Sequence, residues 1–199
     1  MSCVYCGHYI LYKLNDGNFK CAKCKRKFSP KKLQRKAKIL KGFLDELTPN
    51  EISQKYNISY ATVVKEIKNI RIVMAQICEE HFLKKEDIKE FEEYLYIPKN
   101  KNIKKAQNFL TIDFGGKIYN IMLSSLKNYD YNEEEIKYLC TQSRIIKIYD
   151  KKLIKEFWLY FEEFIKKYKG ISEKQFFYYL KEAEFRFNGY KIEVKDLIY

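Results

Sequence analysis

Two Cys-x-x-Cys pairs near the start of the chain constrain its fold more than any other feature. The first pair is Cys3 and Cys6, and the second is Cys21 and Cys24, with fourteen residues between the pairs. Four thiolates at this spacing are typical ligands of a structural zinc ion. So short a segment buries too little apolar surface to fold without such a metal. A redox motif is the alternative reading, but no βαβ pattern surrounds either pair.

The residues between the two pairs have the pattern of a β-hairpin. YILYKL and NFKC flank Asp16-Gly17, a dipeptide that is typical of a tight turn between two strands. We therefore expect a zinc ribbon over residues 1–30. His8 should lie at the surface, because four cysteines already complete a tetrahedral shell. Cys78 and Cys140 fall within apolar helical patterns, and we expect both to be buried thiols rather than ligands.

A dense positive run follows the second cysteine pair. The whole chain has a formal net charge of +13, and ten basic residues with no acidic one lie between Cys21 and Lys41. Such a local excess indicates a polyanionic partner. The residues expected to contact nucleic-acid phosphates are Lys25, Arg26, Lys27, Lys31, Lys32 and Arg35.

Residues 31–84 have the pattern of three helices. In the first, KKLQRKAKILKGFLDEL, the apolar positions at helical spacing are Leu33, Ala37, Leu40 and Leu44. Thr48-Pro49-Asn50-Glu51 has the composition of a capping box, and it opens a short helix that should end at Asn57.

Ser59 can then cap a third and longer helix, for which we expect a buried side made of Val63, Ile67, Ile70 and Met74. A short capped helix, a tight turn and a longer helix form a helix-turn-helix pattern. The early positions expected to reach base edges or phosphates are Tyr60, Thr62, Lys65 and Asn69. An ordinary three-helix bundle without a ligand is the alternative, and the preceding cysteine pairs and basic run favour DNA binding.

Beyond residue 84 the pattern changes from helices to alternating strands and helices. Strands are predicted at 88–97, 108–114, 118–123 and 145–149, and helices at 133–141, 152–168 and 172–187. Gly115-Gly116 should join the second and third strands as a hairpin. Three strands followed by mixed elements predict an α+β or α/β domain over residues 85–199.

Several segments spread over nearly the whole chain resemble one family. They are the cysteine pairs with KRKFSPKK, then FEEYLYIPK, KIYNIML, IKEFWLYFEEFIKKYKGIS and FFYYLKEAEFRFN. The chain resembles a degenerate or shortened member of the insertion-sequence transposases of the DDE type that carry an N-terminal zinc ribbon and helix-turn-helix. The resemblance implies a shortened ribonuclease-H-like domain, in which three carboxylates hold two Mg²⁺ ions for DNA cleavage and strand transfer.

The candidate catalytic set under this resemblance is Glu92, Asp150 and Glu156. The family has Asp-Glu in its first motif, and this chain has Glu92-Glu93. Lys155 stands at the place of the third carboxylate, and Glu156 is one residue further, which rotates a helical side chain by about 100°. Asp150 also lies unusually close to Glu156 in the sequence. We therefore expect an impaired catalytic domain. The alternative for the glutamates is a solvated charged surface.

These patterns together predict a transposase-like DNA-binding protein with an impaired catalytic domain. One alternative is an active DDE-type transposase that uses Mg²⁺, and another is a zinc-ribbon RNA-binding protein. Double-stranded DNA is the expected partner, and self-association into a homo-oligomer stays open. The sequence has no signal-peptide pattern and no apolar stretch long enough to span a membrane, so we expect a cytoplasmic, DNA-associated protein without a membrane partner.

Overall fold

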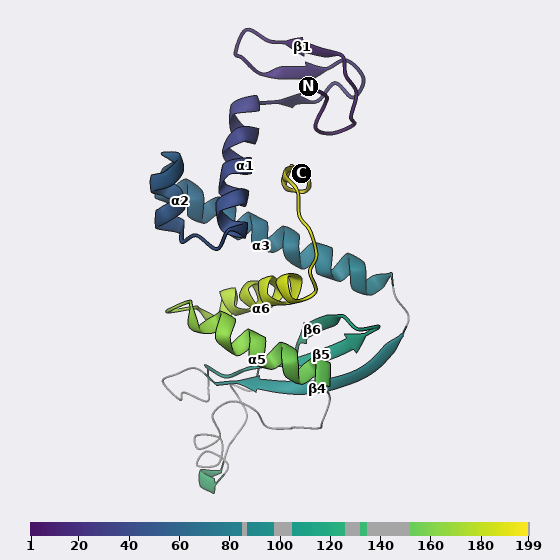
Figure 1. Cartoon of the computed structure of the whole chain (residues 1–199), viewed down its shortest axis with the longest axis vertical. Coiled ribbons are helices and arrows are strands. Elements are labelled where there is room, and N and C mark those ends of the chain that lie inside the picture. Colours follow the sequence, from purple (N-terminus) through teal and green to yellow (C-terminus); the bar gives the residue numbers. More distant parts are fainter. Residues whose placement is uncertain (85–86, 98–104, 126–131, 135–151, 199) are drawn as a thin grey trace. The chain divides into compact units, whose positions relative to one another are not determined.

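The computed structural model describes residues 1–84, 87–97, 105–125, 132–134 and 152–198 (Figure 1). The chain is mixed α+β and divides into two compact units. Unit 1 contains Met1–Val73 and Lys191–Tyr199, and unit 2 contains Met74–Tyr190. This division falls within the third helix, whereas the sequence placed a boundary after residue 84. It also assigns the last residues of the chain to the N-terminal unit.

The N-terminal part of unit 1 is a three-stranded antiparallel sheet. Its strands are β1 (Leu11–Lys13), β2 (Phe19–Cys21) and β3 (Lys27–Phe28), in the order β1-β2-β3. The expected hairpin between β1 and β2 is confirmed. A carboxylate oxygen of Asp16 accepts the backbone N–H of Asn18 at 2.9 Å, and Gly17 takes the positive φ that this turn requires. The short strand β3 was not predicted.

Three helices follow: α1 (Pro30–Leu44), α2 (Pro49–Tyr56) and α3 (Tyr60–Leu83). The capping box of α2 is confirmed. The Thr48 hydroxyl accepts the backbone N–H of Glu51, and the Glu51 carboxylate accepts the backbone N–H of Thr48. Asn57 ends α2 in the left-handed conformation, as a residue of this type can at little cost. Among the helices that the structure describes, none combines the length and the apolar character needed to cross a membrane.

The buried side of α3 agrees with the prediction, because Val63, Ile67, Ile70 and Met74 are all buried. The predicted side of α1 is wrong in part. Leu40 is buried, but Leu44 at the end of the helix is 39% exposed.

The buried stripe of α1 instead passes through Ile39, Leu40 and Phe43. Gly42 lies on the same stripe, where the absence of a side chain admits Ile52 of α2. The face of α1 is therefore set by its close contact with α2, which a local apolar pattern does not reveal.

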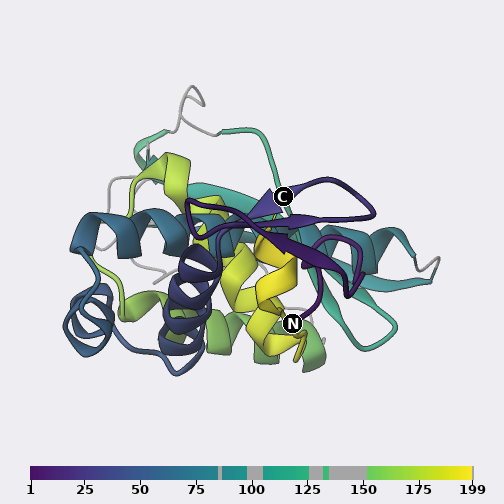
Figure 2. The ribbon, with the colours of Figure 1, turned by 90° about the horizontal axis from the view of Figure 1, so that it is seen from above.

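The C-terminal residues form a short 3₁₀ helix, η3 (Val194–Leu197), that packs beside α1 within unit 1 (Figure 2). The Lys36 ammonium of α1 donates a hydrogen bond of 2.7 Å to the backbone carbonyl of Leu197. Leu197 itself is buried. The two ends of the chain thus contribute to one compact unit.

Unit 2 is built on a second antiparallel sheet. Its strands are β4 (Ile88–Tyr96), β5 (Gln107–Phe114) and β6 (Ile118–Met122), in the order β4-β5-β6. Two helices accompany it, α5 (Lys152–Lys166) and α6 (Glu173–Phe187). These five predicted elements are confirmed within a few residues, and Gly115 and Gly116 both take positive φ in the hairpin. The strand expected at 145–149, and all but the start of the helix expected at 133–141, lie outside the described residues.

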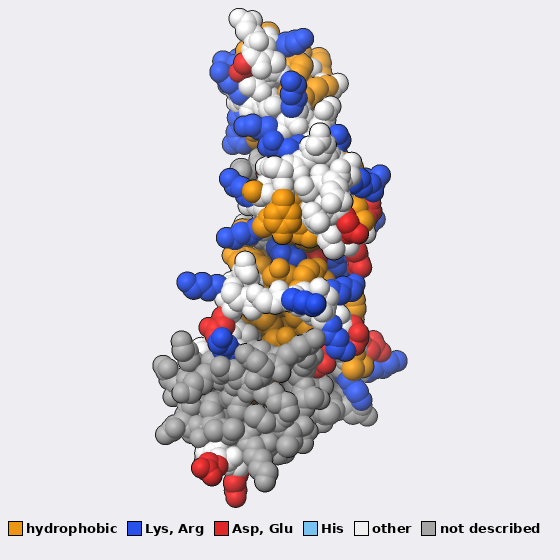
Figure 3. Space-filling model, turned by 90° about the vertical axis from the view of Figure 1, so that its left-hand side faces the viewer, with side chains coloured by type: hydrophobic (Ala, Val, Ile, Leu, Met, Phe, Trp, Pro, Cys, Tyr) orange, Lys and Arg blue, Asp and Glu red, His pale blue; other side chains and the backbone are white. Residues whose placement is uncertain are grey.

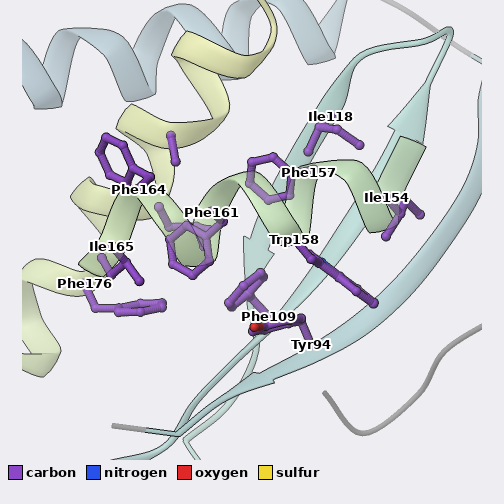
Figure 4. Packing of buried hydrophobic residues seen from close by; sticks show 12 residues of the cluster. Tyr94, Phe109, Ile118, Ile154, Phe157, Trp158, Phe161, Phe164, Ile165 and Phe176 are labelled. Atoms are coloured by element: carbon purple, nitrogen blue, oxygen red, sulfur yellow. The ribbon is translucent and has the colours of Figure 1, made fainter. Parts of the chain in front are cut away.

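Aromatic side chains fill the core of unit 2 (Figure 4). Phe157, Trp158 and Phe161 of α5 pack against Tyr94 and Phe109, which face each other across β4 and β5. Residues of α6 close the same cluster; they include Phe176, Leu180 and Ala183. Cys78 is fully buried, as expected, and Cys140 lies outside the described residues.

A buried polar network crosses this core. The Trp158 indole N–H donates to the Thr111 hydroxyl at 2.9 Å, and that hydroxyl donates to the Asn120 side-chain carbonyl at 2.8 Å. The backbone and side-chain N–H groups of Asn120 then donate to one carboxylate oxygen of Glu184 at 2.8 and 2.9 Å. Lys181 pairs with the same carboxylate at 3.0 Å. The sheet and both helices are thereby joined by specific bonds as well as by apolar packing.

Candidate metal centre and nucleic-acid interface

The four cysteines of the two pairs come together at one end of unit 1. The sulfurs of Cys3 and Cys24 lie 3.6 Å apart, as do those of Cys6 and Cys21, and all four lie within 4.8 Å of one another. Zinc–sulfur bonds of ~2.3 Å in a tetrahedron place neighbouring sulfurs ~3.8 Å apart. The cluster therefore has the donor set and the spacing to hold a metal ion such as zinc.

Each cysteine pair sits in the same kind of backbone turn. The N–H of Gly7 donates to the carbonyl of Cys3 at 2.8 Å, and the N–H of Lys25 donates to the carbonyl of Cys21 at 3.1 Å. The residue after the second cysteine has positive φ in both turns, 71° at Gly7 and 59° at Lys25. A glycine tolerates this conformation, whereas a lysine loses about 1 kcal/mol in it.

Burial and hydrogen bonds shift the pKa values of the two thiols of the second pair in opposite directions. Burial of the Cys21 thiol opposes ionisation, but the backbone N–H groups of Cys24 and Lys23 donate to its sulfur and lower its pKa to about 6. The backbone N–H of Arg26 acts in the same sense on Cys24, yet burial and hydrogen bonds shared with Cys3 raise the pKa of Cys24 to about 11. The turn therefore already favours a thiolate at Cys21, the form that ligates a metal.

The predicted phosphate-binding residues lie next to this cluster. Lys25, Arg26 and Lys27 lie on the segment that leads from the second cysteine pair into β3, and the other three lie on the first turns of α1. All six are exposed, and in the part of the chain that the structure describes no ion pair involves them: Lys25, Arg26, Lys27, Lys31, Lys32 and Arg35. Lys and Arg side chains are prominent over the ribbon in Figure 3. The basic surface is thus available to an anion.

An open groove of about 630 Å³ runs beside this basic surface. It combines cations, aromatic rings and the end of the chain. Its lining residues include Tyr5, Asn18, Arg26, Lys27, Phe28, Ser29, Lys32, Leu33, Lys36, Leu197 and Ile198. All of them belong to unit 1.

Helices α2 and α3 are joined by residues 57–59, in the order short helix, turn and longer helix that the sequence predicts. The Ser53 hydroxyl donates to the carbonyl of Ile58 at 2.7 Å and fixes this turn. At the start of α3, Tyr60 is 57% exposed and Lys65 is also exposed. Thr62 is half-buried and shares a hydrogen bond of 2.8 Å with the Ser59 hydroxyl.

Asn69, the last residue predicted to reach DNA, is also half-buried, two turns further along α3 than Thr62. The first residues of α3 are therefore the better placed for an external ligand. Tyr60 and Lys65 offer an aromatic ring and a cation on that surface.

The predicted carboxylates are distributed over two elements of unit 2. Glu92 of β4 is 8% exposed and stands opposite Thr111 on the sheet face that packs on α5. Glu93 points to the other face, where it accepts a hydrogen bond of 3.3 Å from the Asn108 amide. A solvated surface is thus the wrong reading for Glu92, since it belongs to the inner face of the sheet.

Glu156 is exposed on α5, and so is Lys155 before it. Asp150 lies outside the described residues. Within the described ranges, the four cysteines form the only group of three or more candidate metal ligands close enough to share an ion.

The sequence did not identify several residues that line the groove. Tyr5 lies between the two cysteines of the first pair, where its aromatic side chain was the one available hint. Asn18, Lys36 and the C-terminal Leu197 and Ile198 join the groove only through the fold. The sequence therefore predicts the basic run, but it does not predict the groove beside which these residues lie.

No model of a known protein family matches the chain, and neither a curated protein nor a solved structure matches it.

Proposed function

We propose that this protein is a transposase-like DNA-binding protein whose unit 1 is a zinc-held module for double-stranded DNA. The carrying observation is that one compact unit contains the four-cysteine cluster, six exposed cations, the short helix α2 and the first part of α3. Zinc is the metal that four clustered thiolates most commonly hold at a structural site. Its two positive charges would also offset the negative charge of the thiolates beside the basic run.

The cations and the third helix have separate roles in this proposal. Exposed lysines and arginines next to the ribbon neutralise phosphates, which provides affinity without sequence preference. The exposed start of α3, with Tyr60 and Lys65, reads base edges in the major groove. Thr62 and Asn69 are less exposed and have a supporting role in this recognition of base edges.

Unit 2 is proposed to be a shortened ribonuclease-H-like domain with impaired catalysis. The antiparallel order β4-β5-β6, with α5 packed on one face, is compatible with such a domain. Glu92 points into that face, which would suit a metal ligand, but Glu156 and Lys155 lie on the exposed side of α5. An active transposase would require Asp150 to complete a carboxylate set with Glu92 and Glu156.

Binding of a fluorescent duplex over a salt series tests the proposed function. The test variant replaces Lys25, Lys31 and Arg35, none of which lines the groove, by alanine. The slope of log K against log salt is negative, and each lost phosphate contact makes it less steep by about 0.9, so we expect the slope to become less negative by about 2.7. The matched control replaces three exposed lysines of unit 2, Lys152, Lys169 and Lys174, by alanine and should change the slope much less.

Three results would contradict the proposal. An unchanged slope in the test variant would show that the basic run does not contact phosphates. A wild-type protein that does not bind duplex DNA would contradict the module as a whole. Tighter binding to a structured RNA than to the duplex would favour the RNA-binding alternative.

A further inference from the structure

The groove of unit 1 contains an arginine whose guanidinium lies over an aromatic ring. The Arg26 guanidinium lies 5.0 Å from the centre of the Tyr5 ring. The Tyr5 ring meets Phe28 edge-on at 6.4 Å, and its hydroxyl donates to the carbonyl of Lys27 at 3.4 Å. A guanidinium carries its N–H groups in one plane, so when a cation–π contact positions it, these groups can donate to two oxygens of one phosphate. Lysine has no equivalent geometry.

Two other cations line the groove, and a third one is already engaged. Lys27 and Lys32 are exposed. Lys36 donates to the carbonyl of Leu197 at 2.7 Å and lies 3.7 Å from the Glu66 carboxylate. Lys36 is therefore an anchor for the C-terminal segment rather than a free ligand for an anion.

The remaining surface of the groove is apolar or neutral. Phe28, Leu33, Leu197 and Ile198 provide carbon surface, and the named lining residues include no carboxylate. Cations beside carbon surface match a nucleic-acid strand, in which phosphates alternate with the apolar edges of sugars. A compact inorganic anion would make no use of the apolar residues.

We propose that this groove binds the sugar–phosphate backbone of one strand of duplex DNA. Arg26 donates to a phosphate, Tyr5 positions Arg26, and the C-terminal residues Leu197 and Ile198 contact the same strand. The inference rests on the proposed function, because it places a particular strand contact within the DNA-binding unit. It adds both ends of the chain to a surface that the basic run alone did not define.

A charge pair at Ile198 tests the C-terminal contribution. Ile198→Glu puts a carboxylate into the groove, and Ile198→Gln puts in a neutral side chain of the same length. Both remove the same apolar contact, so their difference reports charge alone. At low salt we expect the glutamate variant to bind a duplex about fivefold more weakly than the glutamine variant, and this difference should shrink as salt rises. Equal affinities at every salt concentration would overturn the C-terminal contact.

Substitutions of Arg26 and Tyr5 test the cation–π pair. Arg26→Ala should weaken binding about tenfold and should make the negative slope of log K against log salt less steep by about 0.9. Arg26→Lys should keep the slope, because the charge remains, but should weaken binding about threefold, because the bidentate geometry is lost. Tyr5→Phe retains the ring and should bind like the wild type. An Arg26→Lys variant with wild-type affinity would overturn the bidentate contact between Arg26 and a phosphate.

The failure of this inference differs from the failure of the proposed function. If the wild-type protein binds the duplex, and if the triple variant of Lys25, Lys31 and Arg35 has a less steep dependence of log K on log salt, the proposed DNA binding by unit 1 is supported. Unaltered binding by the Arg26 and Ile198 variants would then refute the groove alone.

Bound zinc and circular dichroism are measured for every variant, and Arg26→Lys is a surface substitution that we expect to leave the fold intact. Inorganic phosphate serves as a competitor, and displacement of the duplex at low millimolar phosphate would indicate a simple anion site and refute a strand contact.

Discussion

The indole N–H of Trp158 is bonded to the hydroxyl of Thr111 at 2.9 Å, which ties α5 to the middle strand of the sheet in unit 2. The same hydroxyl donates to Asn120 on the neighbouring strand. Trp158 is the single tryptophan of the chain and is 3% exposed. Its fluorescence therefore reports on the packing of unit 2.

Replacement of Thr111 by valine should destabilise unit 2 by about 2–6 kcal/mol. The shape of the side chain is retained, but a buried indole N–H and the buried carbonyl of Asn120 each lose a partner, at about 1–3 kcal/mol apiece. Urea unfolding followed by Trp158 fluorescence measures the loss. Thr111→Ser keeps the hydroxyl and should cost clearly less. Equal losses in the two variants would mean that the methyl group, not the hydrogen bonds, matters.

Much of unit 2 could be predicted from local patterns, and its polar network could not. Alternation in β4 and β5 and the Gly115-Gly116 turn are encoded within a few neighbouring residues. Lys181 and Glu184, by contrast, are fully or nearly fully buried although they look like surface charges on an amphipathic helix. Their burial depends on partners such as Asn120, more than sixty residues away in the sequence.

The change in the free energy of unfolding with pH should reflect the titration of the Glu184 carboxyl. Burial raises the pKa of this carboxyl above its usual 4.5, although Lys181 opposes the shift. A raised folded-state pKa means that the folded protein binds the proton more tightly than the unfolded chain. That stabilisation is complete below pH 4.5 and is lost as the pH rises through the folded-state pKa. Between pH 4.5 and 8, Glu184→Gln should therefore lose less free energy of unfolding than the wild type.

Lys181→Met provides a matched variant with the opposite expected sign. Without the ammonium, the pKa of Glu184 should rise further, and the loss of stability with rising pH should become steeper. Urea unfolding of all three proteins at pH 4.5, 6 and 8 gives the comparison. Parallel pH profiles would show that Glu184 does not titrate differently in the folded state.

In the candidate site, too, local sequence patterns predict some features, whereas others depend on contacts between residues far apart in the sequence. The spacing of Cys3, Cys6, Cys21 and Cys24 predicts that they can hold a metal ion together, because a Cys-x-x-Cys turn can place two sulfurs on one ion. No local sequence pattern predicts the groove. It requires the approach of Ile198 to residues near the start of the chain, and nothing in the local pattern of the C-terminus indicates that contact.

Gly42→Ala should destabilise unit 1 by about 1–3 kcal/mol. A Cβ atom at this position would lie 2.8 Å from Cγ1 of Ile52, a fully buried residue of α2, so α1 and α2 would have to separate. On an exposed helical site the same change is stabilising. Thermal unfolding followed by circular dichroism measures the effect. Ile52→Val in the Gly42→Ala background should recover part of the loss, and a stabilised Gly42→Ala variant would contradict the close helix contact.

Removal of the metal should unfold the ribbon while the core of unit 2 persists. The ribbon buries only a small cluster around Cys3, Cys21 and Phe28, so metal–thiolate bonds must contribute most of its stability. We expect about one zinc ion per chain, its loss on treatment with a strong chelator, and a parallel loss of duplex binding. Trp158 fluorescence should change little, because that residue lies in the core of unit 2.

Cys21→Ser should reproduce the metal-free state that the chelator produces. Cys78→Ser should retain the metal, because Cys78 is not in the cluster. Full duplex affinity in metal-free protein, or metal retention by Cys21→Ser at wild-type strength, would contradict a four-thiolate site that holds the DNA-binding surface in place.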